Sequence, residues 1–237
     1  MLAFGDSITN GGGELQWGVA LQSWALWVAR GLGLPFTGYA VDGARVEDVL
    51  VEQIPAFERR SADPRARYEL GCLYIGVNDV RGLHWDRGAF ERAFRQALCF
   101  LLDRCDRVLA VTAPLDLGRP PAGAKVRELD DAIERAAAEC GALVLDLSEF
   151  GARNLVMADH VHPTAFGQVA IAERALTVLE RDGMRVLVRP SSLIRYETTR
   201  WGRLRSDCTY TYRHLKVRAQ ALAVLARLRI ARPRSPR

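Results

Sequence analysis

The amino-acid sequence predicts an α/β protein with a parallel sheet. Short apolar runs alternate along the chain with helical segments of ten or more residues, which is the pattern of strands joined by helical crossovers. One apolar run, Leu70–Ile75, has no polar alternation, so we expect it to be buried on both faces. With 237 residues, 49% of them hydrophobic, the chain is long enough to bury one sizeable core.

Glycines and apolar spacing place the elements of the N-terminal half. Leu2–Phe4 is predicted to be a buried strand, and Gly5 lets the backbone turn sharply at its end. A helix is expected over Trp17–Leu32, closed by Gly31 and Gly33, and its three tryptophans are interpreted as core anchors. A strand, a helix, a second strand and a second helix follow, over 36–41, 46–59, 70–75 and 87–103.

The C-terminal half continues the alternation. We expect strands over 107–112 and 142–147 and helices over 123–140 and 164–181, the last of which has Pro163 next to its first turn. Beyond it, Met184–Val188 is expected to form an extra edge strand, and a further helix is expected over Arg213–Ile230. Residues 232–237 are expected to fray.

The two parts of the chain carry opposite charge. Residues 1–180 contain 18 basic and 25 acidic side chains, whereas residues 181–237 contain 15 basic and 3 acidic ones. We therefore divide the chain into a globular domain over 1–183 and a basic extension over 184–237. The helix of the extension is expected to pack on the body or to form a homodimer contact, with an anionic membrane surface as the alternative partner. No nucleic acid is expected, because no recognition motif accompanies the charge.

Composition also bounds the compartment and the class of protein. Five cysteines without a CxxC pair or zinc-like spacing are typical of reduced thiols in a cytosolic protein. No secretory signal is expected before a strand that starts at residue 2, and no apolar stretch reaches the ~18 residues of a spanning helix. The glycine-rich loop Asn10–Glu14 lacks the Gly-Lys-Ser/Thr that completes a phosphate-binding loop. A cytoplasmic protein, peripheral to the membrane at most, is expected.

A serine and a histidine from opposite ends of the sequence are candidate catalytic partners. Ser7 lies at the carboxyl end of the first strand, the edge at which open α/β sheets bind ligands. His162 precedes a proline and is expected on a loop, three residues after Asp159. A carboxylate that accepts Nδ1–H would fix the tautomer of the ring and leave Nε2 to take a proton from the serine. His160 is expected to point elsewhere.

Four motifs in this order resemble those of the SGNH, or GDSL, hydrolase family over residues 1–180. They are Gly5-Asp6-Ser7-Ile8-Thr9, the glycine of Val41-Asp42-Gly43-Ala44, Gly76-Val77-Asn78-Asp79, and Asp159-His160-Val161-His162-Pro163. The resemblance implies a three-layer α/β/α sandwich with a doubly wound, flavodoxin-like parallel sheet. It requires no metal and implies no cofactor.

The resemblance also implies a role for each motif residue in serine-dependent hydrolysis of esters. Ser7 is the expected nucleophile, His162 the general base and then general acid, and Asp159 the group that orients the imidazole. The oxyanion hole is expected from the Ser7 N–H, the Gly43 N–H and the Asn78 side chain. Asp79 is expected to brace the loop rather than touch substrate.

Two alternatives remain open from the sequence. The first is an acyltransferase, which would use the same triad with an alcohol in place of water as the acyl acceptor. The second is a binding module with this fold and no catalytic activity. The common α/β-hydrolase arrangement is disfavoured because no Gly-x-Ser-x-Gly occurs. The substrate is expected to be a small ester of an acyl, lipid or sugar group, in a pocket shaped by the loops Arg81–Asp86 and Leu115–Pro121.

Overall fold

A five-stranded, wholly parallel sheet forms the centre of the computed structural model, which describes residues 1–61, 63, 66–152, 154–196 and 199–230. The strand order is β2-β1-β3-β4-β5, the doubly wound flavodoxin-like order, so the predicted fold class is confirmed. The strands are β1 (Leu2–Gly5), β2 (Thr37–Gly38), β3 (Gly71–Tyr74), β4 (Val108–Val111) and β5 (Leu143–Leu145). Every residue of β1, β3 and β4 is buried, as expected of strands covered on both faces.

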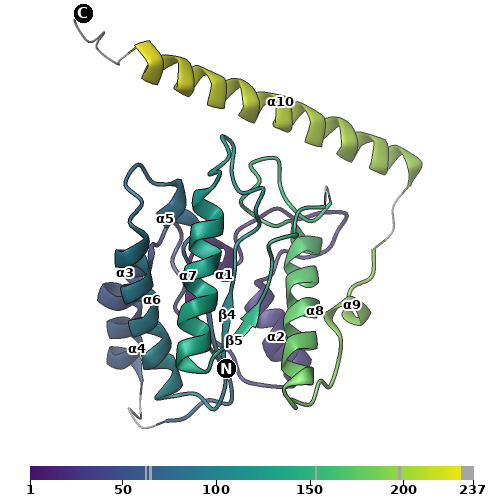
Figure 1. Ribbon diagram of the computed structural model, residues 1–237. Helices are drawn as coiled ribbons and strands as arrows, with labels where there is room; N and C mark the ends of the chain where they lie inside the picture. Colours follow the sequence, from purple (N-terminus) through teal and green to yellow (C-terminus); the bar gives the residue numbers. More distant parts are fainter. Residues whose placement is uncertain (62, 64–65, 153, 197–198, 231–237) are drawn as a thin grey trace, which may run out of the picture.

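Helices cover both faces of the sheet and complete the three layers (Figure 1). The pair α2 (Trp24–Leu32) and α8 (Ala165–Arg181) packs together on one face. On the other face lie α3 (Val46–Asp48), η1 (Val49–Gln53), α4 (Ile54–Arg60), α6 (Arg87–Leu102) and α7 (Lys125–Cys140). Two short helices, α1 (Ser7–Asn10) and α5 (Val77–Arg81), follow β1 and β3, and a third, α9 (Pro190–Leu193), packs beside α8 and α2.

The first long helix starts later than the sequence predicts. Its N-cap is Ser23, whose hydroxyl accepts the Ala25 N–H at 3.2 Å, so the helix begins at Trp24 rather than Trp17. Trp17 itself has a left-handed backbone with φ of 48°, which an α-helix does not allow. Trp24 and Trp27 are buried in the core as expected, whereas Trp17 is only half-buried.

The helix expected over 46–59 contains a π-helical turn. The Ile54 N–H donates to the Val49 carbonyl, five residues back, where an α-helix would use the residue four back. Pro55 follows directly and has no N–H, so it cannot make the regular helical bond either. The turn carries Gln53 inward, where its side chain is buried.

The basic extension differs from the prediction in both of its parts. Met184–Val188 forms no strand; instead the Leu187 and Val188 N–H groups donate to the Gly31 carbonyl at 2.8 and 3.2 Å, which ties the segment to α2. The last helix, α10 (Arg200–Ile230), begins at Arg200 rather than Arg213. The division into two domains stays a prediction, and residues 232–237 lie outside the described residues.

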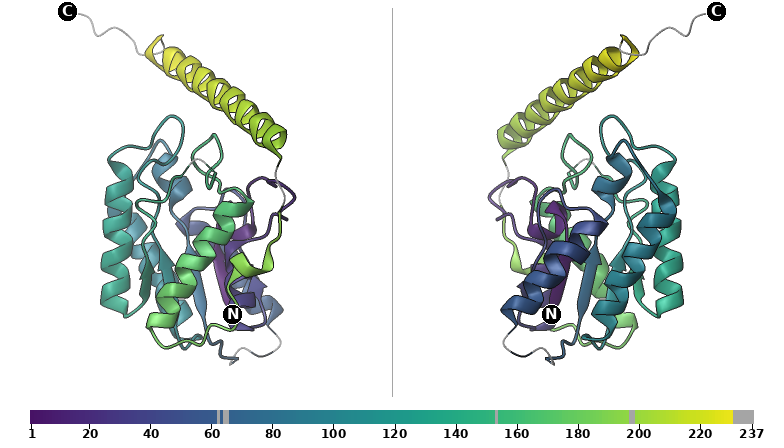
Figure 2. Two further views of the ribbon diagram at one scale, coloured as in Figure 1. Left: turned by 90° about the vertical axis from the view of Figure 1, so that its right-hand side faces the viewer. Right: turned by 90° about the vertical axis from the view of Figure 1, so that its left-hand side faces the viewer.

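Figures 1 and 2 show α10 crossing the end of the molecule toward which the strands point, opposite the N-terminus. Arg213 of this helix forms an ion pair with Glu14, and His214 lies 5.8 Å from the ring of His160. Among the described helices, none is long and apolar enough to cross a membrane.

Candidate active site

The backbone at the end of β1 sets the position of Ser7. A Cβ at Gly5 would lie 2.5 Å from the Tyr74 carbonyl oxygen, so only glycine lets β1 run this close to β3. Asp6 then caps α1, with its carboxylate accepting the Ile8 N–H at 3.0 Å. Ser7 is therefore the first residue of a helix that starts directly at the carboxyl end of a buried strand.

Ser7, His162 and Asp159 form a continuous chain of hydrogen bonds. The Ser7 Oγ lies 2.9 Å from His162 Nε2, and His162 Nδ1 lies 2.7 Å from Asp159 Oδ2. The other carboxylate oxygen, Oδ1, accepts the backbone N–H groups of Val161 and His162 at 2.9 and 3.1 Å. These two bonds hold the carboxylate still, so the imidazole it contacts has a fixed orientation.

The electrostatics of this chain favour an imidazole that accepts a proton. The hydrogen bond that His162 donates to Asp159 raises the pKa of His162 above the ordinary value of 6.5, although burial opposes the shift. Burial alone would raise the pKa of Asp159, but the hydrogen bonds from His162 and Val161 outweigh it and hold that pKa below its ordinary value. Asp159 is thus an anion wherever His162 can accept a proton.

Asp6 is the second carboxylate that acts on the histidine. It is fully buried, and burial raises its pKa to about 7 although the Ile8 N–H opposes the shift. Its Oδ2 atom is buried without a hydrogen-bond partner within the described chain. The charge of Asp6 contributes to the raised pKa of His162.

The loop that contains Gly43 is tied to both neighbouring strand ends. Asn10, at the end of α1, donates its side-chain N–H to Asp42 at 2.9 Å, and Asn78 donates its Nδ2 to the Ala44 carbonyl at 3.0 Å. Gly43 lies between these two anchors with φ of 79°, a conformation that favours glycine. The structure thus brings the segments of Ser7, Gly43 and Asn78 to the same edge of the sheet.

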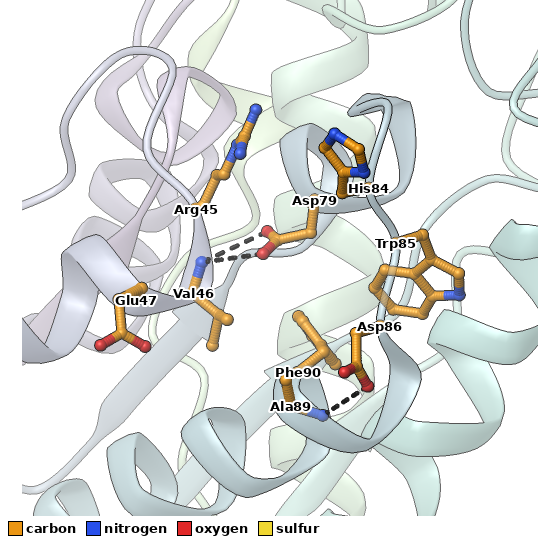
Figure 3. Close-up of a pocket in the computed structure, with 9 residues that line it drawn as sticks. All are labelled: Arg45, Val46, Glu47, Asp79, His84, Trp85, Asp86, Ala89 and Phe90. Carbon is orange, nitrogen blue, oxygen red and sulfur yellow. Dashed lines mark hydrogen bonds between the residues drawn. The ribbon is translucent and has the colours of Figure 1, made fainter.

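Asp79 supports the Gly43 loop through hydrogen bonds to its backbone, as expected. Its carboxylate accepts the Val46 N–H at 3.2 and 3.3 Å, and burial raises its pKa to about 6. Figure 3 shows the carboxylate pointing at that N–H, in a pocket of about 220 Å³ whose other walls include Arg45, Trp85 and Phe90. Asp79 therefore links the two loops that carry Gly43 and Asn78.

Two buried glutamines that the sequence analysis missed hold the serine in place. Gln53 pairs with both backbone groups of Gly5, accepting its N–H at 3.0 Å and donating to its carbonyl at 2.8 Å. Gln168 donates to the Ile8 and Gly12 carbonyls, both at 3.0 Å, and accepts the Trp24 N–H at 2.7 Å. In the sequence, the one sign of either glutamine's role is that it is a polar residue on an otherwise apolar face of a predicted helix.

His160 points away from the serine, as expected. Its ring contacts Arg119 at 2.8 Å and Asp116 at 2.9 Å, outside the Ser7–His162–Asp159 chain. In the part of the chain that the structure describes, no three His, Cys, Asp or Glu side chains are grouped so that they could hold a metal ion.

Solved structures with this fold are ester-cleaving enzymes by name. A member of the lipolytic G-D-S-L family from Veillonella parvula has a TM-score of 0.60 and 24% identity, covering 76% of this chain and 97% of that one. An acetylxylan esterase from Geobacillus stearothermophilus (0.57, 19% identity, 75% and 92%) and an extracellular lipase from Streptomyces rimosus (0.55, 21%, 76% and 97%) are also similar. At these identities the likeness shows the three-layer α/β/α fold alone.

The sequence itself gives the family. Residues 3–170 match the GDSL-like lipase/acylhydrolase family, so the chain belongs to it and is a carboxylic ester hydrolase. The resemblance noted from the four motifs is thereby confirmed. No match was found among curated proteins.

Proposed function

We propose that the chain hydrolyses carboxylic esters through a Ser7–His162–Asp159 triad and a covalent acyl-enzyme. The observation that carries the proposal is the hydrogen-bond chain from Ser7 Oγ to His162 Nε2 at 2.9 Å and from His162 Nδ1 to Asp159 at 2.7 Å. A serine hydroxyl is a weak nucleophile at its free pKa and needs an adjacent base, which is in turn oriented by a third group. These three side chains supply that arrangement.

In the proposed first half-reaction, Ser7 Oγ attacks the ester carbonyl carbon and its proton passes to His162 Nε2. Asp159 stabilises the imidazolium that forms. The tetrahedral intermediate then collapses, the bond to the alcohol oxygen breaks, and His162 donates its proton to the leaving alcohol. In the second half-reaction a water attacks the acyl group by the same route and releases the acid.

The negative charge on the carbonyl oxygen needs donors that are in place before the reaction. We assign this role to the Ser7 N–H, the Gly43 N–H and the second N–H of Asn78 Nδ2, the first being used on the Ala44 carbonyl. Loss of one such donor typically lowers turnover on the order of 10²–10³-fold. The ties from Asn10 and Asn78 to the Gly43 loop support this assignment, because they limit its movement.

Hydrolysis is favoured over acyl transfer because solvent reaches the triad. The His162 and Asp159 side chains keep 30% and 33% of their surface exposed. Transfer to an alcohol requires that water be kept from the acyl-enzyme. Catalytic groups that keep about a third of their surface exposed do not exclude water from the site.

The test is ester hydrolysis by the purified chain and by Ser7→Ala. We expect p-nitrophenyl esters of increasing acyl length to be cleaved by the natural sequence, with activity lost in the variant. Product analysis with an added alcohol separates hydrolysis from transfer. Equal activity in Ser7→Ala would refute the proposal.

A further inference from the structure

A second pocket beside the triad is lined by three cations and by no acidic side chain within the described residues. Its volume is about 430 Å³, and its walls are residues 80–83 at the end of α5, residues 119–122, and Lys125 at the start of α7. Arg81, Arg119 and Lys125 are the cations. The two loops that were expected to shape the substrate pocket therefore meet here.

The pocket lies within electrostatic reach of the triad. The positive charge of Arg81 acts on the His162 imidazole and opposes its protonation. Arg119 hydrogen bonds to the ring of His160 at 2.8 Å, and the His160 carbonyl accepts the Gly118 N–H at 2.8 Å. The loop that carries His160 and His162 therefore contacts the loop that carries Arg119, which lines the pocket.

Two of the three cations are not neutralised by a carboxylate. Asp116 binds Arg119 through two bonds of 2.8 Å. Lys125 donates only to the Gly82 carbonyl, at 3.3 Å, and the exposed Arg81 guanidinium has no hydrogen bond or ion pair to another described residue.

Glu128, three residues after Lys125 on α7, accepts the Trp85 indole N–H at 2.7 Å and does not line the pocket. This surplus of positive charge contrasts with the body of the chain, whose residues 1–180 carry more acidic than basic side chains. A cleft lined by one sign of charge raises the local concentration of ligands of the opposite sign.

We propose that this pocket binds an anionic group, a carboxylate or a phosphate, carried by the ester substrate. The inference rests on the proposed serine hydrolase function, because Arg81 lies on the same short helix, α5, as Asn78 and its charge acts on His162. Arginine and lysine are the side chains that recognise carboxylate and phosphate oxygens in proteins. Because Arg81 is exposed, its contribution is modest and screened by salt.

The experiment compares matched esters with and without the anionic group. For a carboxylate, kcat/KM is measured on p-nitrophenyl adipate and p-nitrophenyl hexanoate. For a phosphate, it is measured on acetylglycerol 3-phosphate and monoacetylglycerol. We expect the anionic ester to be preferred in at least one pair, and the preference to fall about tenfold in Arg81→Gln, by the loss of one charge-assisted bond. Arg81→Lys should retain it, and added salt should weaken it.

Arg127→Gln is the matched control, because Arg127 lies on α7 two residues after Lys125 but is exposed outside the pocket. We expect its ratio of anionic to neutral kcat/KM to equal that of the natural sequence. No preference for either anionic ester, or an equal fall in Arg81→Gln and Arg127→Gln, would overturn the inference. Either result leaves Ser7-dependent cleavage of the neutral esters intact, so it is distinct from a failure of the proposed function.

Discussion

At the scale of single residues, the distances around His162 decide the chemistry. The Ser7 hydroxyl lies 2.9 Å from Nε2 of the ring and the Asp159 carboxylate lies 2.7 Å from Nδ1, so each ring nitrogen has one hydrogen-bond partner. Asp159 is fixed by two backbone N–H groups and Ser7 by the turn at Gly5. The site is therefore arranged before any substrate binds, which is what transition-state stabilisation requires.

The pH dependence of kcat/KM follows from the raised pKa of His162. The imidazole must be neutral to accept the serine proton, so activity should be absent at low pH and rise as His162 loses its proton. Because that pKa lies above 6.5, the ascending limb should be centred above 6.5. In Asp159→Asn we expect the limb to shift to lower pH and kcat to fall on the order of 10⁴-fold.

Asp182→Asn is the control for this profile, since Asp182 pairs with Arg107 at 2.6 Å and has no contact with the triad. Its profile should match that of the natural sequence. An ascending limb that does not move in Asp159→Asn would show that a group other than the Asp159–His162 pair controls the rate.

At the scale of elements, the π-helical turn supplies a side chain that a regular helix would not. Gln53 ends this turn and lies beside Gly5, past the end of β2 at Gly38, where the Val41 N–H also donates to the Gly5 carbonyl at 3.1 Å. The Gln53 side chain accepts the Gly5 N–H and adds a second donor to the Gly5 carbonyl, at the last residue before the Asp6-Ser7 corner. π-turns are frequent at functional sites.

Gln53→Met should therefore lower both stability and turnover. Without the amide, the buried Gly5 N–H has no partner, which costs about 1–3 kcal/mol in the free energy of unfolding. We expect kcat to fall more than KM rises, measured well below the melting temperature of the variant. Gln96→Met, at an exposed position on α6, should change neither quantity. If Gln53→Met is less stable but keeps the kcat of the natural sequence, Gln53 has only a structural role.

The first two-thirds of helix α10 present four large apolar side chains to solvent rather than to the body. Among residues 200–205 and 207–220, the half-buried positions are Gly202, Tyr210, His214 and Val217, and the face opposite the last three is exposed. Trp201, Leu204, Tyr212 and Leu215 on that face keep 77%, 50%, 67% and 62% of their surface. Arginine and lysine flank this face, and like charges oppose pairing of two copies, so we propose an anionic membrane surface as the partner.

We expect the full chain to cosediment with vesicles that contain phosphatidylglycerol and to be released by salt. The double variant Trp201→Ser, Leu204→Ser should lose most of this binding. Val51→Ser, which alters a similarly exposed apolar side chain on η1, should keep it. Equal binding to neutral vesicles, or a dimer in size-exclusion chromatography that the double variant abolishes, would contradict a lipid surface as the partner.

At the scale of the whole molecule, parallel topology explains why four distant motifs could be placed from sequence. Each follows a predicted strand or precedes a predicted helix, and the carboxyl ends of parallel strands meet at one edge. The Gly5, Gly43 and Gly76 turns and the Asp159–His162 spacing are local features, so the residues themselves reveal them.

The features that the sequence did not reveal depend on contacts between distant residues. Gln53 and Gln168 matter through the Gly5, Ile8 and Gly12 backbone groups, more than forty positions away in sequence. Met184–Val188 has strand-like composition, but its N–H groups find the Gly31 carbonyl instead of a sheet edge. The basic pocket likewise forms only when the loops at Arg81 and Arg119 meet.

The most direct test of the triad is covalent labelling by a fluorophosphonate, located by mass spectrometry of peptides. We predict one modified peptide, with the label on Ser7, and we predict that labelling slows greatly in His162→Ala and stops in Ser7→Ala. A label on another residue, or labelling that persists in Ser7→Ala, would contradict the assignment of Ser7 as the nucleophile.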